Sequence, residues 1–157
     1  MTSRAENSVA IERRIDASPE IVFSFFTDPE RYRRWQGKQA ELDPRPDGVF
    51  RVTVSGRTRT VASGRFIRVE PSRRITFTWG WEQADGLPDD MRVPPGTTTV
   101  DVELIPDGDG TLVRLRHGDL PSAPARHFHS WGWDLSFDRL VLVAQGRPPG
   151  PDPFADM

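Results

Sequence analysis

The chain has 157 residues, of which 36% are hydrophobic and 28% charged, so its length fits one domain with a single core. It contains no cysteine, which excludes disulfides, thiolate nucleophiles and cysteine-ligated metal centres. The formal net charge of −2 argues against a nucleic-acid binder, and no apolar run approaches the roughly 18 residues of a membrane span. The N-terminal residues lack the order of a signal peptide, so a cytoplasmic location is expected.

The first part of the chain predicts a strand followed by two short helices. Residues 1–8 are expected to be disordered, and the first strand covers Val9 to Ile15. Ser18 as N-cap and Pro19 at the first helical position indicate the start of a helix. A second start gives a short helix from Asp28 to about Trp35.

Beyond these helices the hydrophobic pattern changes to a period of two, which is typical of strands. The predicted strands cover Val49–Val54, Thr58–Val69, Ile75–Glu82, Thr97–Ile105 and Leu112–His117. The strongest alternation places Phe77, Trp79 and Trp81 on one face, and Asp107–Gly110 predicts a hairpin turn. Each strand has one apolar and one polar face, which predicts an antiparallel sheet covered on one side only.

The chain ends in a predicted long helix and a proline-rich tail. The helix covers about Ala123 to Gln145. Its apolar face centres on His129, Gly132, Trp133, Ser136, Phe137, Leu140, Val143 and Ala144. The prolines of residues 147–157 oppose helix and sheet, so this segment is expected to be a flexible tail, and a frayed end is favoured over docking of Phe154. The folded domain therefore covers residues 9–146.

Several segments resemble the START-like (SRPBCC) superfamily and, within it, the family named for the C-terminal domain of the activator of heat shock protein 90 ATPase. The matching pieces are Ala17–Phe23, Asp28–Glu30, Gly64–Phe66, Ile75–Trp79, His117-Gly118 with Leu120, and His129-x-x-Gly132-Trp133 with Phe137 and Leu140. The resemblance covers roughly residues 9–146. It implies an α+β helix-grip fold, in which a curved antiparallel sheet of about six to seven strands wraps around the long C-terminal helix. The resemblance also implies two short helices after strand 1 and a cavity between sheet and helix.

Aromatic side chains are expected to line that cavity, because five tryptophans and nine phenylalanines exceed what a core needs. The candidate ligand-binding residues are Phe66, Phe77, Trp79, His117, His129, Trp133, Ser136 and Phe137. For each aromatic residue taken alone, core filling is favoured over ligand contact. A neutral imidazole at His129 could hydrogen-bond a ligand carbonyl or hydroxyl, with a packing role as the favoured alternative. Turn stabilisation is favoured for His117.

Metal and catalytic motifs are not expected in this chain. His127 and His129 would lie about 200° apart on a helix and cannot share one ion. Ser136 is about 10 Å along the helix axis from His129, too far for a direct hydrogen bond. The sequence has no phosphate-binding glycine loop, nucleophile elbow or HExxH motif. No catalytic residue, metal or cofactor is therefore predicted.

Three functions stay open, because the superfamily includes binders, cyclases, hydroxylase subunits and cochaperones. The favoured one is binding of a small, largely apolar or aromatic ligand in the cavity. The alternatives are a polyketide cyclase/aromatase-like enzyme that uses the same cavity with His129 or His117 as acid–base group, and a cochaperone-like interaction module. A chaperone partner is the least expected, since in eukaryotic relatives this domain works beside an N-terminal domain.

Two further surface features are open to alternative interpretations. The acidic segment Glu82–Pro95 is favoured as a solvated loop, with a cover over the cavity mouth as the alternative. Trp131, Leu135 and Leu142 form a secondary apolar stripe on the last helix, which could rest on the sheet edge or support a homodimer.

Overall fold

The computed structural model describes residues 7–55, 59–84 and 87–155. Residues 1–6 of the predicted disordered N-terminus, the predicted strand start at Thr58 and the last two tail residues lie outside the described residues. The elements in chain order are β1 (Val9–Ile15), α1 (Pro19–Thr27), α2 (Pro29–Tyr32), β2 (Gln39–Leu42), β3 (Val49–Ser55), β4 (Thr60–Glu70), β5 (Arg74–Trp79), β6 (Trp81–Ala84), the 3₁₀ turn η1 (Asp89–Met91), β7 (Thr98–Asp107), β8 (Gly110–Gly118) and α3 (Ala123–Ala144).

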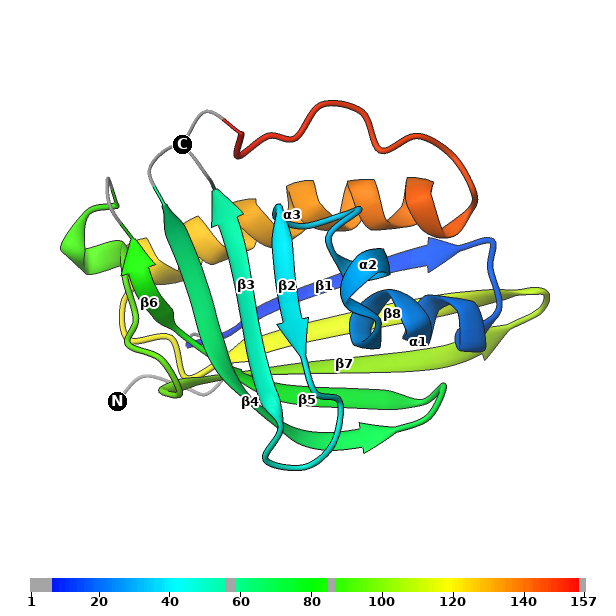
Figure 1. The fold of residues 1–157 in the computed structure, drawn as a ribbon, viewed down its shortest axis with the longest axis horizontal. Helices are drawn as coiled ribbons and strands as arrows, with labels where there is room; N and C mark the ends of the chain where they lie inside the picture. The colour runs from blue at the N-terminus through cyan, green and yellow to red at the C-terminus, as the bar shows by residue number, and fades with distance from the viewer. Residues whose placement is uncertain (1–6, 56–58, 85–86, 156–157) are drawn as a thin grey trace.

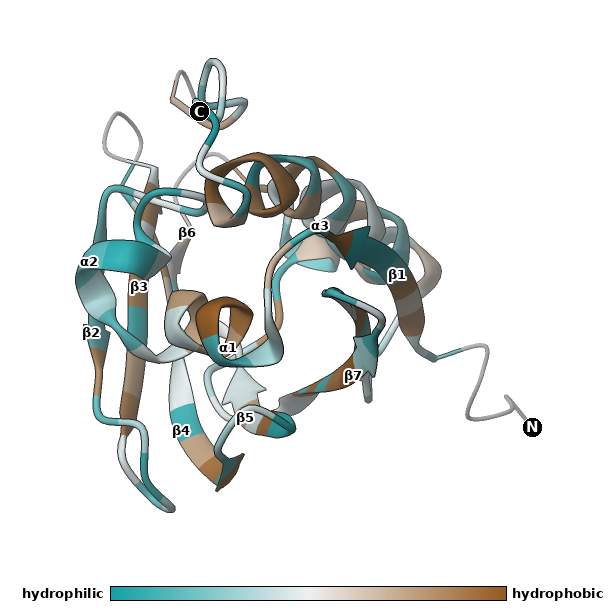
Figure 2. Ribbon diagram, turned by 90° about the vertical axis from the view of Figure 1, so that its right-hand side faces the viewer, coloured by the Kyte–Doolittle hydropathy of each residue, from teal (hydrophilic) through white to brown (hydrophobic). Residues whose placement is uncertain are grey.

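The sheet is antiparallel throughout, and eight strands belong to it within the described residues. Its strand order is β1-β8-β7-β5-β4-β3-β2, and β6 pairs with β4 beside this path. The sheet curves along the length of α3, while α1 and α2 pack at one end (Figure 1). Seen from that end, the strands curl around α1 and α3 (Figure 2). The predicted helix-grip architecture is confirmed.

The first two helices begin at the residues that the sequence indicates, Ser18 and Asp28, and the structure adds Ser122 as the cap of α3. The side chains of Ser18, Asp28 and Ser122 each accept a hydrogen bond from a backbone N–H of the following first turn. In all three helices proline stands in the first turn, where its missing N–H costs nothing. The second helix ends at Tyr32, shorter than the predicted end near Trp35. Among the described residues, no helix is long and apolar enough to cross a membrane.

Two strand assignments differ from the prediction. β2 was not predicted, because a four-residue edge strand of exposed and half-buried residues has too short an alternation to detect. The strand predicted over residues 75–82 is divided into β5 and β6 at Gly80. A Cβ at Gly80 would overlap the backbone of Pro94, so this close approach requires glycine. The break lets β6 follow the first half of β4 while β5 follows its second half.

The core between sheet and helices contains a layer of aromatic rings. Phe50 stacks on Phe77 with ring centroids 4.1 Å apart, and Phe66 meets both rings edge-on. At the other end of this layer, Phe137 of α3 contacts Phe26 of α1 edge-on at 6.3 Å. These rings are fully buried and fill the space between the layers.

The proline-rich segment after α3, predicted to be a flexible tail, lies along the outside of that helix as far as residue 155. After Gly146, which adopts a positive φ of 78° beyond the end of α3, the chain turns and runs back along the outside of that helix (Figure 1). Phe154 is 5% exposed and packs edge-on against Trp131 with ring centroids 5.5 Å apart. The prolines exclude regular secondary structure, but they leave an aromatic ring free to dock against α3.

Candidate functional site

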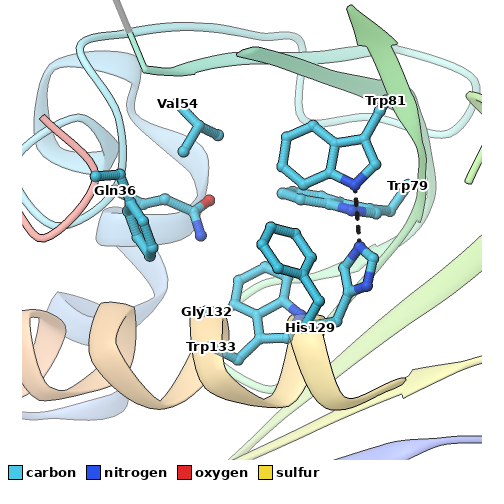
Figure 3. Close-up of a pocket in the computed structure, with 9 residues that line it drawn as sticks. Gln36, Val54, Trp79, Trp81, His129, Gly132 and Trp133 are labelled. Atoms are coloured by element: carbon cyan, nitrogen blue, oxygen red, sulfur yellow. Dashed lines mark hydrogen bonds between the residues drawn. The ribbon is translucent and has the colours of Figure 1, made fainter. Parts of the chain in front are cut away.

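A narrow pocket of about 30 Å³ lies between the sheet and α3. Nine residues from the helix, three strands, the segment after α2 and the tail line it (Figure 3): Gln36, Val54, Trp79, Trp81, Phe128, His129, Gly132, Trp133 and Phe154. At neutral pH none of these nine side chains carries a formal charge, given the neutral state of His129 derived below. The pocket therefore suits a neutral ligand, since a buried charge without a partner is costly.

The volume sets a limit on what the pocket holds in this conformation. A water molecule needs about 10–15 Å³ of such space, whereas an apolar cavity of about 150 Å³ binds benzene. The present 30 Å³ has room for about two or three water molecules. An aromatic ligand would enter only after one of the lining side chains has moved.

His129 forms part of the pocket wall, and both of its ring nitrogens are hydrogen-bonded. The indole N–H of Trp81 donates to Nε2 at 3.1 Å, shown as the dashed line in Figure 3. Because an indole nitrogen only donates, Nε2 must be unprotonated and the hydrogen must sit on Nδ1. Nδ1 lies 2.6 Å from the carbonyl oxygen of Ala125, one turn earlier in α3, and donates to it.

His117 of β8 repeats this arrangement with the opposite tautomer. The indole N–H of Trp133 donates to Nδ1 at 3.0 Å, so the hydrogen of this imidazole sits on Nε2. Nε2 lies 2.8 Å from the hydroxyl of Thr98, which in turn donates to the carbonyl oxygen of Trp79 at 2.7 Å. His117 does not line the pocket, because Trp133 and Trp79 stand beside it.

Both histidines are neutral in the folded protein at pH 7. Burial lowers the pKa of His117 well below its ordinary value, and nearby His129 lowers it further. Burial also lowers the pKa of His129 to about 4, against the opposing effect of the Ala125 carbonyl. The two rings lie 5.0 Å apart, so a charge on one would disfavour a charge on the other.

Trp79, one of the residues that line the pocket, carries a buried polar group without a hydrogen-bond partner among the described residues. Its side chain is 2% exposed, and its indole N–H has no hydrogen-bond partner. The ring packs against Trp81 at 5.3 Å and Trp133 at 5.1 Å, so it stands at the centre of the aromatic cluster. A buried donor of this kind costs about 1–3 kcal/mol until an acceptor meets it.

A chain of buried hydrogen bonds runs through the side chain of Gln36. The hydroxyl of Tyr32 donates to the Gln36 carbonyl oxygen at 2.5 Å, and the Gln36 amide nitrogen donates to the Ser136 hydroxyl at 3.2 Å. Burial raises the pKa of Tyr32 well above its ordinary value, so its hydroxyl stays protonated. This chain ties the segment after α2 to α3 and holds Gln36 at the pocket.

The structure divides the eight candidate residues predicted from the sequence into two groups. Trp79, His129 and Trp133 line the pocket. The remaining five are buried behind or beside the wall without lining it: Phe66, Phe77, His117, Ser136 and Phe137. For the three phenylalanines the core-filling alternative describes their position.

The pocket residues outside that set differ in how far the sequence pattern pointed to them. Trp81 shares the strand alternation that identified Trp79, and Gly132 belongs to the helix motif. Gln36 lies on a loop, where no pattern distinguishes it, whereas Val54 shares the apolar face of β3 with Phe50 and Val52. Phe154 was assigned to a frayed end. Within the segment Glu82–Pro95, none of the described residues lines the pocket.

The described residues contain no group of three His, Cys, Asp or Glu side chains that could hold a metal ion. The chemistry available is that of an apolar pocket with one free donor. His129 in the pocket wall and His117 behind it could accept a proton only after losing an indole hydrogen bond.

Solved structures with this architecture come from bacteria and from a eukaryote. An AHSA1-like protein from Rhizobium etli is 40% identical over 98% of this chain and 92% of its own, with a TM-score of 0.68. CalU16 from Micromonospora echinospora is 33% identical over 90% of this chain and 76% of its own, with a TM-score of 0.69. An Hsp90 activator from Plasmodium falciparum, at 23% identity, shares the fold with a TM-score of 0.69 over 90% of this chain and 97% of its own.

No curated protein matches the chain at a significant level. The family described as "Activator of Hsp90 ATPase homolog 1-like protein" matches residues 16–145, which run from the end of β1 to the end of α3. The helix caps, the Gly64-Arg65-Phe66 strand and the helix motif at His129 all lie inside the match. The chain therefore belongs to the Activator of Hsp90 ATPase homolog 1-like family.

Proposed function

We propose that this protein binds a small, neutral, largely aromatic ligand that carries one hydrogen-bond acceptor, in the pocket between the sheet and α3. The observation that carries the proposal is the unpaired indole N–H of Trp79, buried in a wall of aromatic rings. A carbonyl or ether oxygen on the ligand would pair with this donor, and the rings would supply the apolar contact.

The uncharged lining sets the class of ligand. A carboxylate or an ammonium group would lose its hydration without gaining a partner there, whereas an aromatic ring loses nothing by leaving water. Ligand pockets typically combine mostly apolar walls with a few polar groups that fix orientation. Trp79 takes that orienting role in the proposal.

Binding is favoured over acid–base catalysis by the state of the two histidines. Each accepts an indole N–H and donates to an oxygen, so neither ring offers a free lone pair. A general base needs such a lone pair within reach of the substrate proton. The aromatic cluster holds His117 and His129 as hydrogen-bonding supports of the wall.

The proposal can be tested with two ligands of matched shape, 2-acetylnaphthalene and 2-isopropylnaphthalene. Only the first carries a carbonyl oxygen. We expect the wild-type protein to bind the ketone about 5-fold or more tightly than the hydrocarbon, as measured by isothermal titration calorimetry, since a hydrogen bond contributes about 1 kcal/mol. The variant Trp79→Phe should bind both with equal affinity, because it keeps the ring and loses the N–H.

Native mass spectrometry of the protein from its own cells gives an independent test. An extra mass that is lost on denaturation would identify the natural ligand by its weight. The proposal would be overturned if neither naphthalene bound the wild-type protein or Trp79→Phe and if native mass spectrometry showed only the mass of the polypeptide.

A further inference from the structure

The tail is attached to the outside of α3 mainly through one aromatic ring. Phe154 is 5% exposed, lines the pocket and packs edge-on against Trp131. Its ring tip lies 4.0 Å from the position that a Cβ on Gly132 would occupy. The absence of a side chain at Gly132 therefore leaves the space on α3 into which the ring fits.

The rest of the tail has little hold on the domain. Arg147, directly after the helix, donates its backbone N–H to the carbonyl oxygen of Leu142 at 2.8 Å. Beyond it, the hydrogen bonds that residues 148–155 make among the described residues stay within the tail. The carboxylate of Asp152 accepts from the N–H of Phe154 at 2.9 Å, and its carbonyl accepts from the N–H of Ala155 at 3.2 Å.

This local turn fixes the position of Phe154 relative to Asp152 but does not fasten either residue to the sheet or the helix. Among the described residues, release of the ring consequently breaks no hydrogen bond to the domain. It exposes one phenylalanine side chain and frees the tail up to the helix end. The cost is small enough for a bound ligand to offset, because a ligand ring would bury comparable apolar area.

We infer that Phe154 is a displaceable plug of the pocket, and that an aromatic ligand binds by taking its place over Gly132 and beside Trp131. The inference rests on the proposed function and adds its regulation, since the tail and the ligand exclude one another. The inference also accounts for the small volume of the pocket. Phe154 forms part of the wall of this 30 Å³ pocket, so the pocket gains the space of a benzene ring when Phe154 leaves.

Affinity for 2-acetylnaphthalene in the full-length chain tests the competition. The variant Phe154→Ala should bind this probe at least 10-fold more tightly than the wild type, because the probe no longer has to displace a buried ring. Pro151→Ala changes an exposed residue of the same tail and should bind like the wild type. Circular dichroism confirms that each variant is folded.

Limited digestion of the wild-type protein by chymotrypsin tests displacement without any substitution. Chymotrypsin takes an aromatic residue into a hydrophobic slot, so cleavage after Phe154 requires this ring to leave the pocket. Saturating 2-acetylnaphthalene should accelerate the loss of residues 155–157, followed by mass spectrometry, at least 10-fold.

The outcomes separate the two proposals. Equal affinity of wild type and Phe154→Ala, with a cleavage rate that the probe leaves unchanged, would overturn the plug and leave ligand binding intact. Absence of binding to either protein would overturn the plug for this probe, and with a bare native mass and no binding of 2-isopropylnaphthalene it would overturn the proposed function as well.

Discussion

The indole N–H of Trp133 donates to Nδ1 of His117 across 3.0 Å, and this single bond fixes which nitrogen of a fully buried imidazole carries the hydrogen. The same relationship recurs between Trp81 and His129 at 3.1 Å. The two pairs connect β8 and β6 to α3, so the sheet and the helix are joined by hydrogen bonds that exist only while both rings are neutral.

The first prediction concerns the pH dependence of stability. The pKa of His129 is about 4 in the folded protein, against about 6.5 in an unfolded chain. As the pH falls from about 6.5 towards 4, His129 binds a proton in the unfolded state but not in the folded state, so the free energy of unfolding decreases. His129 should contribute a loss of about 2 kcal/mol between pH 7 and pH 5, and His117, whose pKa is also lowered, should add to it.

The variant His129→Gln isolates this contribution, because glutamine keeps an acceptor for Trp81 and does not titrate. Urea unfolding at pH 7 and pH 5 should show a loss about 2 kcal/mol smaller for His129→Gln than for the wild type. His127→Gln, at an exposed position of the same helix, should follow the wild type. Parallel losses in all three proteins would contradict the assignment of neutral histidines.

The second prediction compares two tryptophans of the same cluster. Trp133→Phe removes the donor to His117 and leaves a buried nitrogen unpaired, whereas Trp79→Phe removes a donor that had no partner. Both substitutions trim a buried indole to a smaller ring, so their packing losses are similar. Trp133→Phe should be less stable than Trp79→Phe by about 1–3 kcal/mol in urea unfolding at pH 7. Equal stabilities of the two variants would show that the indole–imidazole hydrogen bond adds nothing to the free energy of unfolding.

The fold could be predicted from the sequence because its signals are local. Ser18, Asp28 and Ser122 cap helices with their own side chains, and the alternation in β5 and β7 reports which face is buried. The missed strand β2 and the break at Gly80 depend on contacts with distant residues, Gly80 on the Pro94 backbone above all. No window of sequence contains those contacts.

The site was harder to predict, because the alternation along a strand shows only which side chains point inward. It does not show whether such a side chain lines a pocket or fills the core. Phe77 and Trp79 share one face of β5, yet Phe77 stacks on Phe50 while Trp79 lines the pocket. The difference arises from what the neighbouring elements place opposite each ring. Phe154 lies 22 residues after Gly132, and only the return of the tail along α3 brings the two together.

The third prediction concerns Gly132 in the middle of α3. A Cβ there would meet Phe154 at 4.0 Å, an ordinary van der Waals contact. Gly132→Ala should therefore stabilise the protein by about 0.5–1 kcal/mol through helix propensity, without displacing the tail. Gly132→Leu would fill the space that Phe154 occupies, so chymotrypsin should cleave it after Phe154 faster than it cleaves wild type or Gly132→Ala. Equal cleavage of all three would show that Gly132 does not seat the ring.

The fourth prediction concerns Gly64, the glycine of the strand motif Gly64-Arg65-Phe66. A Cβ on Gly64 would overlap the carbonyl group and the hydroxyl oxygen of Thr78 on the neighbouring strand. That hydroxyl accepts the backbone N–H of Arg65 at 2.9 Å, so the strands cannot separate without loss of this bond. Gly64→Ala should destabilise the protein by roughly 2–3 kcal/mol in urea unfolding, as expected of an overpacked site that cannot relax.

Gly118, at the end of β8, provides the matched control for this substitution. It is also a glycine at a strand position, and a Cβ built on it meets no atom within 4 Å. Gly118→Ala should change the free energy of unfolding by no more than about 0.5 kcal/mol. If Gly64→Ala proves as harmless as Gly118→Ala, the close approach of β4 to β5 is not a constraint on the sheet, and the glycine of the motif must be explained by something other than backbone contact.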